Sequence, residues 1–211
     1  TGSTLSVGGS TATLSVLNLT LTSGTFAAGT ATAINVTGDW TNNGGTFTPG
    51  TGTVNFNNTA APQNINGTAV TQTFNNIAVA KTAQALSVAA STATLNFNNI
   101  TLTSGTFAAG SASAINVTGN WTNNGGTFAP GTGTVIFNGS GAQALTGTAT
   151  SQTFYNVAVA KAAGTTLSVA GTTATLNLNN ITLTSGIFNA GTATTINTTG
   201  DWTNNAGATA F

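Results

Sequence analysis

The chain has 211 residues, no cysteine, no histidine and only four charged side chains, which are Asp39, Lys81, Lys161 and Asp201. Charged residues make up 2% of the chain, against about 25% in typical soluble domains. Two lysines cannot neutralise a track of phosphates, so nucleic-acid binding by a basic face is excluded, and the lack of cysteine excludes disulfides and thiol chemistry.

A long internal repeat organises the chain. The stretch 34–47 returns as 115–128 and, imperfectly, once more towards the end of the sequence. The three tryptophans, Trp40, Trp121 and Trp202, are evenly spaced along the chain. Their interval of about 81 residues is the period of the repeat. A repeat of this length constrains the architecture more strongly than any shorter pattern in the sequence.

We expect residues 1–211 to form one continuous repeat array. The copies fall at about 4–84, 85–165 and 166–211, and the last copy is incomplete. Because the sequence starts and stops inside its own repeat, we expect a mature fragment or a window on a longer array. No apolar run approaches the ~18 residues that a membrane-spanning helix needs, so no membrane span is expected.

Each copy divides into units of about 20 residues that begin with a T-x-T or S-x-T triplet. Apolar and polar residues alternate after the triplets, as in 54–58, 74–77 and 95–100, and this alternation predicts half-buried strands. Asn-Asn and Gly-Gly pairs predict the turns, because Asn and Gly accept a positive φ at low cost.

These units predict an all-β fold, namely a parallel β-solenoid (β-helix) of ~20-residue coils with four coils in each ~81-residue repeat. One coil cannot bury its apolar side chains alone, so stacking of neighbouring coils at ~4.8 Å would build the core. The alternative is a tandem series of β-sandwich domains, because about 81 residues is close to the ~100 residues of an immunoglobulin-like domain. The short triplet period favours the solenoid.

Aromatic residues at repeating positions are expected to form a structural core ladder. We expect Phe56, Phe74 and Phe97 to share one inward column with Val36 and Val117. The complete expected ladder consists of Phe56, Phe74, Phe97, Phe137, Phe154, Trp40, Trp121 and Trp202.

Asparagine is expected to stack as well. Asn57, Asn75 and Asn98 are predicted to form an amide ladder in which each side chain bonds to the next coil. N-x-S/T sequons also leave glycans open as partners. They occur at Asn18, Asn35, Asn57, Asn66, Asn99, Asn116, Asn138, Asn180 and Asn197.

The residue inventory argues against an enzyme. Asp39 and Asp201 occupy equivalent repeat positions, and the middle copy has Asn120 there, so the position does not need an acid. Acid–base catalysis needs two differently tuned groups, and hard-metal sites need clustered carboxylates. Lys81 and Lys161 are expected to be solvated at strand ends. We expect no catalytic residue, no cofactor and no metal site.

The T-x-T triplets support one functional expectation. If Val54 and Phe56 point inward, then Thr51 and Thr53 point outward. Flat faces with T-x-T in register resemble those of solenoid ice-binding proteins, whose threonine arrays order surface water. The expected surface ladder consists of Thr51, Thr53, Thr71, Thr73, Thr92, Thr94, Thr132, Thr134, Thr173 and Thr175.

The runs 36–47, 50–56 and 152–157 resemble repeats in very large bacterial surface and secreted proteins of the β-strand-repeat, adhesin-like kind. The resemblance covers the whole chain. It implies export and a structural or adhesive role, and it implies no catalytic residue.

The composition also favours a structural role with self-association, because so few charges provide little repulsion between copies. We expect a structural protein that forms a filament, stalk or surface fibre outside the cell or on its surface. Its partner would be itself, end to end or within a longer array. The alternatives are an ice-binding solenoid and a carbohydrate-binding adhesin that stacks sugars on exposed tryptophans.

Overall fold

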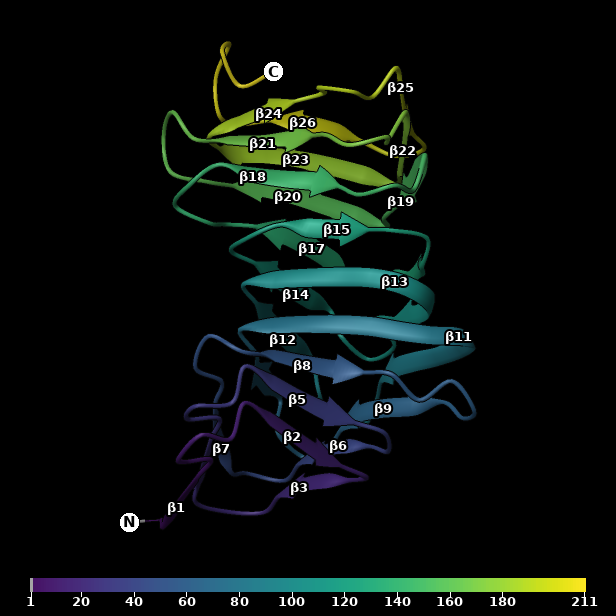
Figure 1. The fold of residues 1–211 in the computed structure, drawn as a ribbon. Coiled ribbons are helices and arrows are strands. Elements are labelled where there is room, and N and C mark those ends of the chain that lie inside the picture. Colours follow the sequence, from purple (N-terminus) through teal and green to yellow (C-terminus); the bar gives the residue numbers. More distant parts are fainter. Residues whose placement is uncertain (1) are drawn as a thin grey trace.

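The computed structural model describes residues 2–211, and within this range it consists of strands and turns without a helix. Neighbouring strands pair in parallel. Register partners lie about 20 residues apart at the closest, as Thr13 and Ala33 do, and about 25 residues apart at the widest, as Trp40 and Ile65 do. The predicted parallel β-solenoid is therefore confirmed. Figure 1 shows the coils stacked in one column with the two termini at opposite ends.

Each coil has three sides, which we call faces A, B and C in chain order. Face A stacks β2 (Thr13–Val16), β5 (Ala33–Val36), β8 (Thr53–Phe56), the first part of β11 (Asn76–Val88), the first part of β13 (Asn99–Ala108), β15 (Trp121–Asn123), β18 (Gln143–Thr146), β21 (Thr166–Val169) and β24 (Ile187–Asn189).

Face B stacks β3 (Leu19–Leu21), β6 (Trp40–Asn42), β9 (Gln63–Asn66), the later parts of β11 and β13, β16 (Thr127–Ala129), β19 (Ser151–Thr153), β22 (Thr175–Leu178) and β25 (Thr195–Thr198).

Face C stacks β1 (Thr4–Ser6), β4 (Thr25–Ala27), β7 (Thr46–Thr48), β10 (Thr71–Thr73), β12 (Thr94–Phe97), β14 (Ala114–Val117), β17 (Thr134–Phe137), β20 (Asn156–Ala160), β23 (Asn180–Ser185) and β26 (Trp202–Asn204).

The sequence repeat is not a whole number of coils. Counting β11 and β13 twice because each crosses two faces, β14 is the eleventh strand position after its repeat equivalent β5. Eleven positions on three faces are three and two-thirds coils, where four were expected. Equivalent strands therefore lie on different faces: β5 on A, β14 on C and β25 on B. Each copy is turned by one third of a coil relative to the previous copy.

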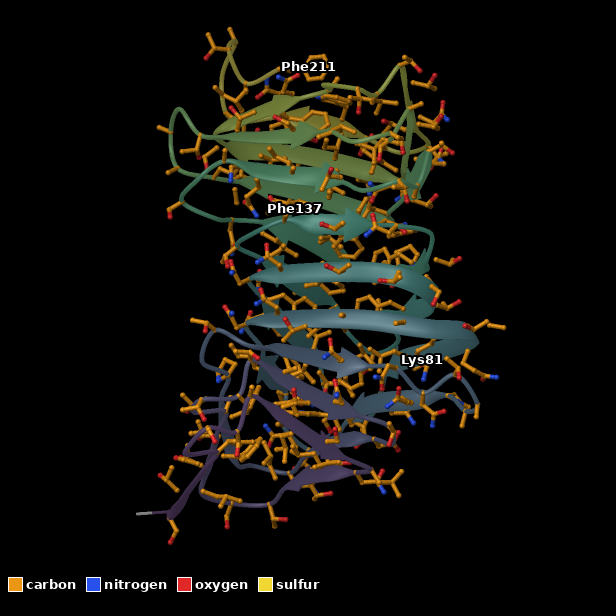
Figure 2. The ribbon with its side chains drawn as sticks, in the orientation of Figure 1. Lys81, Phe137 and Phe211 are labelled. Carbon is orange, nitrogen blue, oxygen red and sulfur yellow. The ribbon has the colours of Figure 1, made fainter. Side chains whose placement is uncertain are left out.

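The core follows from the period-2 alternation of the strands. In β8, Val54 and Phe56 are buried while Thr53 and Asn55 are half-buried, and β12, β17 and β22 repeat this pattern. The inward side chains form one continuous column of apolar residues. Figure 2 places Phe137 within this column and Phe211 at its C-terminal end.

Glycine is required at one corner of the repeat. Gly29, Gly110 and Gly191 have φ of 56°, 53° and 53°, in the left-handed region that side chains avoid. A Cβ atom on these residues would lie 1.9, 1.8 and 1.9 Å from a carbonyl oxygen of the coil below. Their backbone thus makes the close approach that joins one coil to the next.

Candidate functional site

The expected core ladder is buried except at the last coil. Phe56, Phe74, Phe97, Phe137 and Phe154 are at most 2% exposed, as are Trp40 and Trp121. Trp202 is 39% exposed, so the expectation that it lies in the core is wrong. It lies on β26, the last strand of face C, and no further strand covers it.

The ladder is also not one column. Val36 pairs with Phe56 on face A, whereas Phe97 pairs with Val117 on face C. The single column expected for these residues is therefore wrong, because the repeat is not a whole number of coils and each copy moves the motif to another face.

Amide ladders exist at strand centres and also at strand starts, where Asn99 Nδ2 donates to Asn76 Oδ1 at 2.8 Å, but not at the expected residues. Asn55 Nδ2 donates to Asn35 Oδ1 at 2.8 Å, and Asn116 Nδ2 donates to Asn96 Oδ1 at 2.8 Å. The ladder expected at Asn57, Asn75 and Asn98 is wrong. Within a strand, the asparagine between two inward apolar residues faces outward, which aligns it with the same position one coil away.

The T-x-T triplets do not stack into one surface ladder. Thr53 has Asn76 as its register partner, Thr71 has Thr94, and Thr134 has Asn156. Thr71 and Thr73 lie exposed on a strand, and Thr51 and Thr132 lie exposed before a strand begins. Thr94 and Thr175 are half-buried, like Thr53 and Thr134.

Two members of the expected surface ladder are completely buried. Thr92 and Thr173 are 0% exposed, so their outward assignment is wrong. Thr92 Oγ1 accepts a hydrogen bond from Gln72 Nε2 at 2.8 Å, and Thr173 Oγ1 accepts one from Gln152 Nε2 at 2.9 Å. These threonines hold an inward glutamine and do not meet solvent.

Both lysines are buried, which corrects the expectation of solvated strand-end lysines. Lys81 is 0% and Lys161 is 2% exposed. Lys81 Nζ donates to the carbonyl oxygens of Asn58 and Ala61 at 2.8 and 3.0 Å, and to Gln63 Oε1 at 2.8 Å. Lys81 is part of β11, and Figure 2 shows it at a corner of the column.

Lys161 makes the same three bonds one copy later. Its Nζ donates to the carbonyl oxygens of Gly139 and Gly141 at 3.0 and 2.8 Å, and to Gln143 Oε1 at 2.7 Å. In both copies the lysine holds the loop of the coil below, before that loop enters the next strand. We call these two arrangements the Lys–Gln clamps.

Glutamine completes each clamp. Gln63 Oε1 also accepts the backbone N–H of Asn58 at 3.1 Å, while Gln63 Nε2 donates to the carbonyl oxygens of Val36 and Gly38. Gln143 repeats these bonds with Gly139, Val117 and Gly119. One buried amide thus connects three successive coils, and its four hydrogen bonds satisfy both polar atoms.

Burial changes the chemistry of the amines. Desolvation lowers the pKa of Lys81 from 10.5 to about 8, although the charge of Asp39 acts in the opposite direction. Desolvation likewise lowers the pKa of Lys161. The amines contact carbonyl and amide oxygens only, so the arrangement suits a structural clamp. The sequence carried one signal for it, because lysine and glutamine are 18 residues apart in both copies.

The acidic position in the repeat is structural as well. Asp39 Oδ1 accepts the backbone N–H of Asn64 at 2.7 Å, and Asn120 Oδ1 accepts that of Ala144 at 2.9 Å. In the middle copy, the amide oxygen of Asn120 therefore accepts the hydrogen bond that the carboxylate of Asp39 accepts in the first copy. Residues 2–211 contain no cluster of three or more His, Cys, Asp or Glu that would hold a metal ion.

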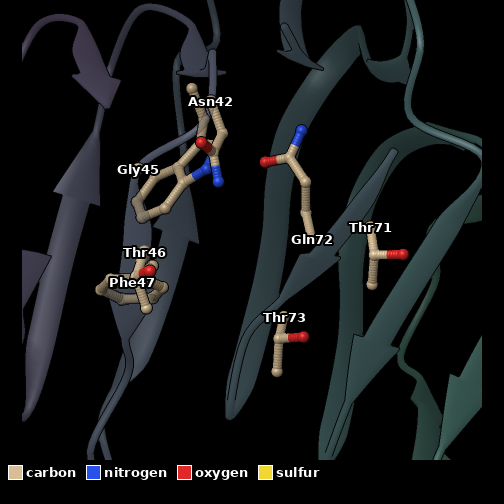
Figure 3. A pocket seen from close by; sticks show the side chains of 8 residues that line it. Asn42, Gly45, Thr46, Phe47, Thr71, Gln72 and Thr73 are labelled. Atoms are coloured by element: carbon tan, nitrogen blue, oxygen red, sulfur yellow. The ribbon is translucent and has the colours of Figure 1, made fainter. Parts of the chain in front are cut away.

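One face opens at an equivalent place in each complete copy. On face C, β7 and β10 belong to neighbouring coils but are not hydrogen-bonded to each other, and on face B the same holds for β16 and β19. A cavity of about 210 Å³ lies at the first break and one of about 130 Å³ at the second. We call them the face C cleft and the face B cleft. Figure 3 shows Asn42, Thr46 and Phe47 on one side of the face C cleft, and Thr71, Gln72 and Thr73 on the other.

Three comparisons with known proteins, against family models, curated sequences and solved structures, gave no match. Fold and sites are therefore interpreted from their geometry. In the part of the chain that the structure describes, no helix is long and apolar enough to cross a membrane.

Proposed function

We propose that this chain is a structural protein that forms an extracellular filament, stalk or surface fibre and that it carries out no catalysis. The observation that supports this most directly is that successive copies use the same strand registers on different faces. Ile34 pairs with Val54 and Ile115 pairs with Val135, so a copy packs by one rule irrespective of the face on which it begins. Because each copy pairs with its neighbours in the same strand registers, further copies can extend the column.

The interior suits a load-bearing column. Backbone ladders run along all three faces, with one break each on faces B and C. The rings of Phe107 and Phe128 stack between neighbouring coils, and the Lys–Gln clamps join coils through side chains. Pulling the column apart along its axis would have to break these contacts together.

Composition supports a location outside the cell or on its surface. Both lysines are buried, and the chain has no arginine, so the folded column offers no exposed cleavage site to proteases of trypsin specificity. The resemblance to repeats of bacterial surface proteins agrees with this.

Self-association is the proposed mode of contact. The strands β1, β2 and β3 at one end, and β25 and β26 at the other, lie at the ends of their sheets and have one unpaired edge each. The outer edge of β24 is partly covered, because Phe188 N donates to Ala210 O at 2.8 Å. Unpaired edges are templates for further strands. We propose that a second copy, or the next repeat of a longer array, pairs there.

Electron microscopy of the purified chain over a range of concentrations, together with sedimentation velocity, tests the proposal. We expect rods of uniform width that lengthen with concentration. In a genetically joined array, each added copy should lengthen the rod by about 18 Å, which is three and two-thirds coils at ~4.8 Å. Monodisperse monomers at high concentration would contradict self-assembly.

A pair of variants on β25 controls for non-specific association. Ile196→Lys places a charge on a half-buried, inward residue of an end strand and should shorten the rods. Asn197→Lys adds the same charge to the outward neighbour and should leave rod length unchanged.

Neither alternative function gains support at the surface residues for which the sequence predicted it. Ice binding would need all the triplet threonines in register on a flat face. Thr71 does pair with Thr94, but Thr53 and Thr134 pair with asparagine. Stacking of sugars on a tryptophan of every copy would need three exposed rings, and only Trp202 is exposed while Trp40 and Trp121 are buried. Reshaping of growing ice crystals by the purified protein is the measurement that would restore the first alternative.

A further inference from the structure

The two clefts arise because strand pairing is interrupted on one face at the same place in both complete copies of the repeat. At the face C cleft, the other two faces of the same pair of coils remain paired, through β5 with β8 and β6 with β9. At the face B cleft, β15 pairs with β18 and β17 with β20. The coils therefore separate on one face only, at equivalent positions of the two copies.

Aromatic rings accompany the separation. At the face C cleft the ring centroid of Trp40 lies 4.7 Å from Phe47 and 5.0 Å from Phe74, and Phe47 and Phe74 are 6.0 Å apart. Trp121, Phe128 and Phe154 repeat the cluster at the face B cleft, with centroid distances of 4.7, 5.0 and 5.6 Å. Rings from both sides of each break pack together. Trp40 and Phe47 line the face C cleft, and Trp121, Phe128 and Phe154 line the face B cleft.

Unsatisfied polar atoms lie at the same two places. Among residues 2–211, the buried side-chain atoms without a hydrogen-bond partner are Gln72 Oε1, Gln152 Oε1 and Trp40 Nε1. All three belong to residues that line the clefts. An unpaired buried polar atom costs about 1–3 kcal/mol. Such atoms are rare in folded proteins, and each one calls for a partner.

The amide of Gln72 is held in one orientation. Its Nε2 donates to Asn66 O at 2.9 Å and to Thr92 Oγ1 at 2.8 Å, which leaves Oε1 free. Figure 3 shows the side chain of Gln72 directed across the cleft towards Asn42. Gln152 is fixed in the same way by Thr146 O and Thr173 Oγ1. The unpaired acceptor in each cleft is thus set by the buried threonines.

We propose that each cleft is a binding site for a small, neutral, polyhydroxylated molecule of about monosaccharide size. At the face C cleft, a hydroxyl group that enters between β7 and β10 as far as these buried atoms can donate to Gln72 Oε1 and also accept from Trp40 Nε1, which a pure donor or a pure acceptor cannot do. At the face B cleft the unpaired buried atom is Gln152 Oε1. Asn42, Thr46 and Thr73 provide further polar groups around the opening. The aromatic residues that line each cleft provide apolar contact for the carbon skeleton of such a ligand.

Charge and size limit the ligand. No charged side chain lines either cleft, so nothing there compensates the desolvation of an ionic ligand. Cavities of 210 and 130 Å³ are smaller than the ~300–1,000 Å³ of sites for drug-sized ligands. The binding does not depend on filament formation, and the two sites face different directions because the repeat turns.

Solution NMR of the chain tests the proposal, because its three tryptophans give three indole N–H signals. Trp40 and Trp121 line the clefts, and Trp202 lines neither, so its signal is an internal reference. The probe is methyl β-D-glucopyranoside, with glucuronate as its charged counterpart. We expect saturable shifts of the Trp40 and Trp121 signals with the neutral probe in the millimolar range, weaker shifts with glucuronate, and an unmoved Trp202 signal.

Blocking variants separate cleft binding from surface effects. Thr46 and Thr127 are exposed residues at the two openings, so Thr46→Phe and Thr127→Phe should each abolish the shift of one tryptophan and spare the other. Thr48→Phe alters the same strand β7 outside the cleft and should bind as the unaltered chain does. Shifts that persist in the doubly blocked chain, or no saturable shift with the neutral probe because the clefts hold only ordered water, would overturn the proposal.

Discussion

Lys81 Nζ donates a hydrogen bond of 2.8 Å to Gln63 Oε1 inside the column, with both residues 0% exposed. Lys161 and Gln143 repeat the bond at 2.7 Å in the next copy. In a chain with two lysines, both are placed where a charge is costly, and both hold a loop to the coil above. The clamps therefore give the fold a dependence on pH that its composition alone would not suggest.

Stability should rise with pH through the alkaline range. Burial lowers the pKa of Lys81 to about 8 in the folded chain, from 10.5. Between these values the unfolded chain binds more protons than the folded chain, so the free energy of unfolding increases with pH. Urea denaturation at several pH values between about 7 and 9.5 measures this. The combined variant Lys81→Met with Lys161→Met should have a flatter profile, and an equally steep profile would contradict the assignment.

Removal of the glutamine partner should cost more than removal of both partners. Gln63→Leu leaves Lys81 buried without its amide acceptor and frees the carbonyl oxygens of Val36 and Gly38, so we expect a loss of about 3 kcal/mol. Adding Lys81→Met removes the buried amine, which has then lost one of its three acceptors, and should recover part of that loss. A double-mutant cycle from denaturant midpoints measures the coupling, and strictly additive losses would show that the bond contributes no coupling energy.

The corner glycine should resist substitution. Gly110→Ala places a Cβ atom 1.8 Å from Val88 O on a backbone with φ of 53°, so we expect a loss of more than about 1–3 kcal/mol, or failure to fold. Gly141→Ala is the matched control, since a Cβ there meets nothing within 4 Å. Thermal unfolding followed by circular dichroism compares the two, and similar midpoints would contradict the close approach of the coils.

The same tryptophan motif should differ in energy between copies. Trp121 is 0% exposed and packs against Phe128 and Phe154, so Trp121→Ala should cost about 3–5 kcal/mol. Trp202 is 39% exposed, and Trp202→Ala should cost about 1 kcal/mol because it loses less buried area. Denaturant midpoints test this ranking, and equal losses would show that Trp202 is buried in solution, for example by a second copy stacked at that end.

The sequence by itself determined the class of fold and the direction of most side chains. Regular triplets, period-2 alternation as in Val54 and Phe56, and Asn or Gly at turns are local signals, and each one requires only neighbouring residues. They predicted parallel coils of about 20 residues and the burial of Phe56, Phe97 and Trp121. The equivalence of Asp39 and Asn120 likewise showed that this position needs no acid.

Only the tertiary structure determined which residues of neighbouring coils pair with each other and on which face they lie. A repeat with four triplets suggests four equal coils, but the three-sided coils are on average longer than a quarter of the repeat, and the copies consequently turn from face to face. The number of residues in each coil depends on contacts between residues far apart in the sequence. It determines that Thr92 is buried, that Phe56 and Phe97 lie on different faces, and that Lys81 contacts Gln63. The sheet breaks and their unpaired amides also depend on contacts between residues far apart in the sequence, which alternation along a single strand cannot encode.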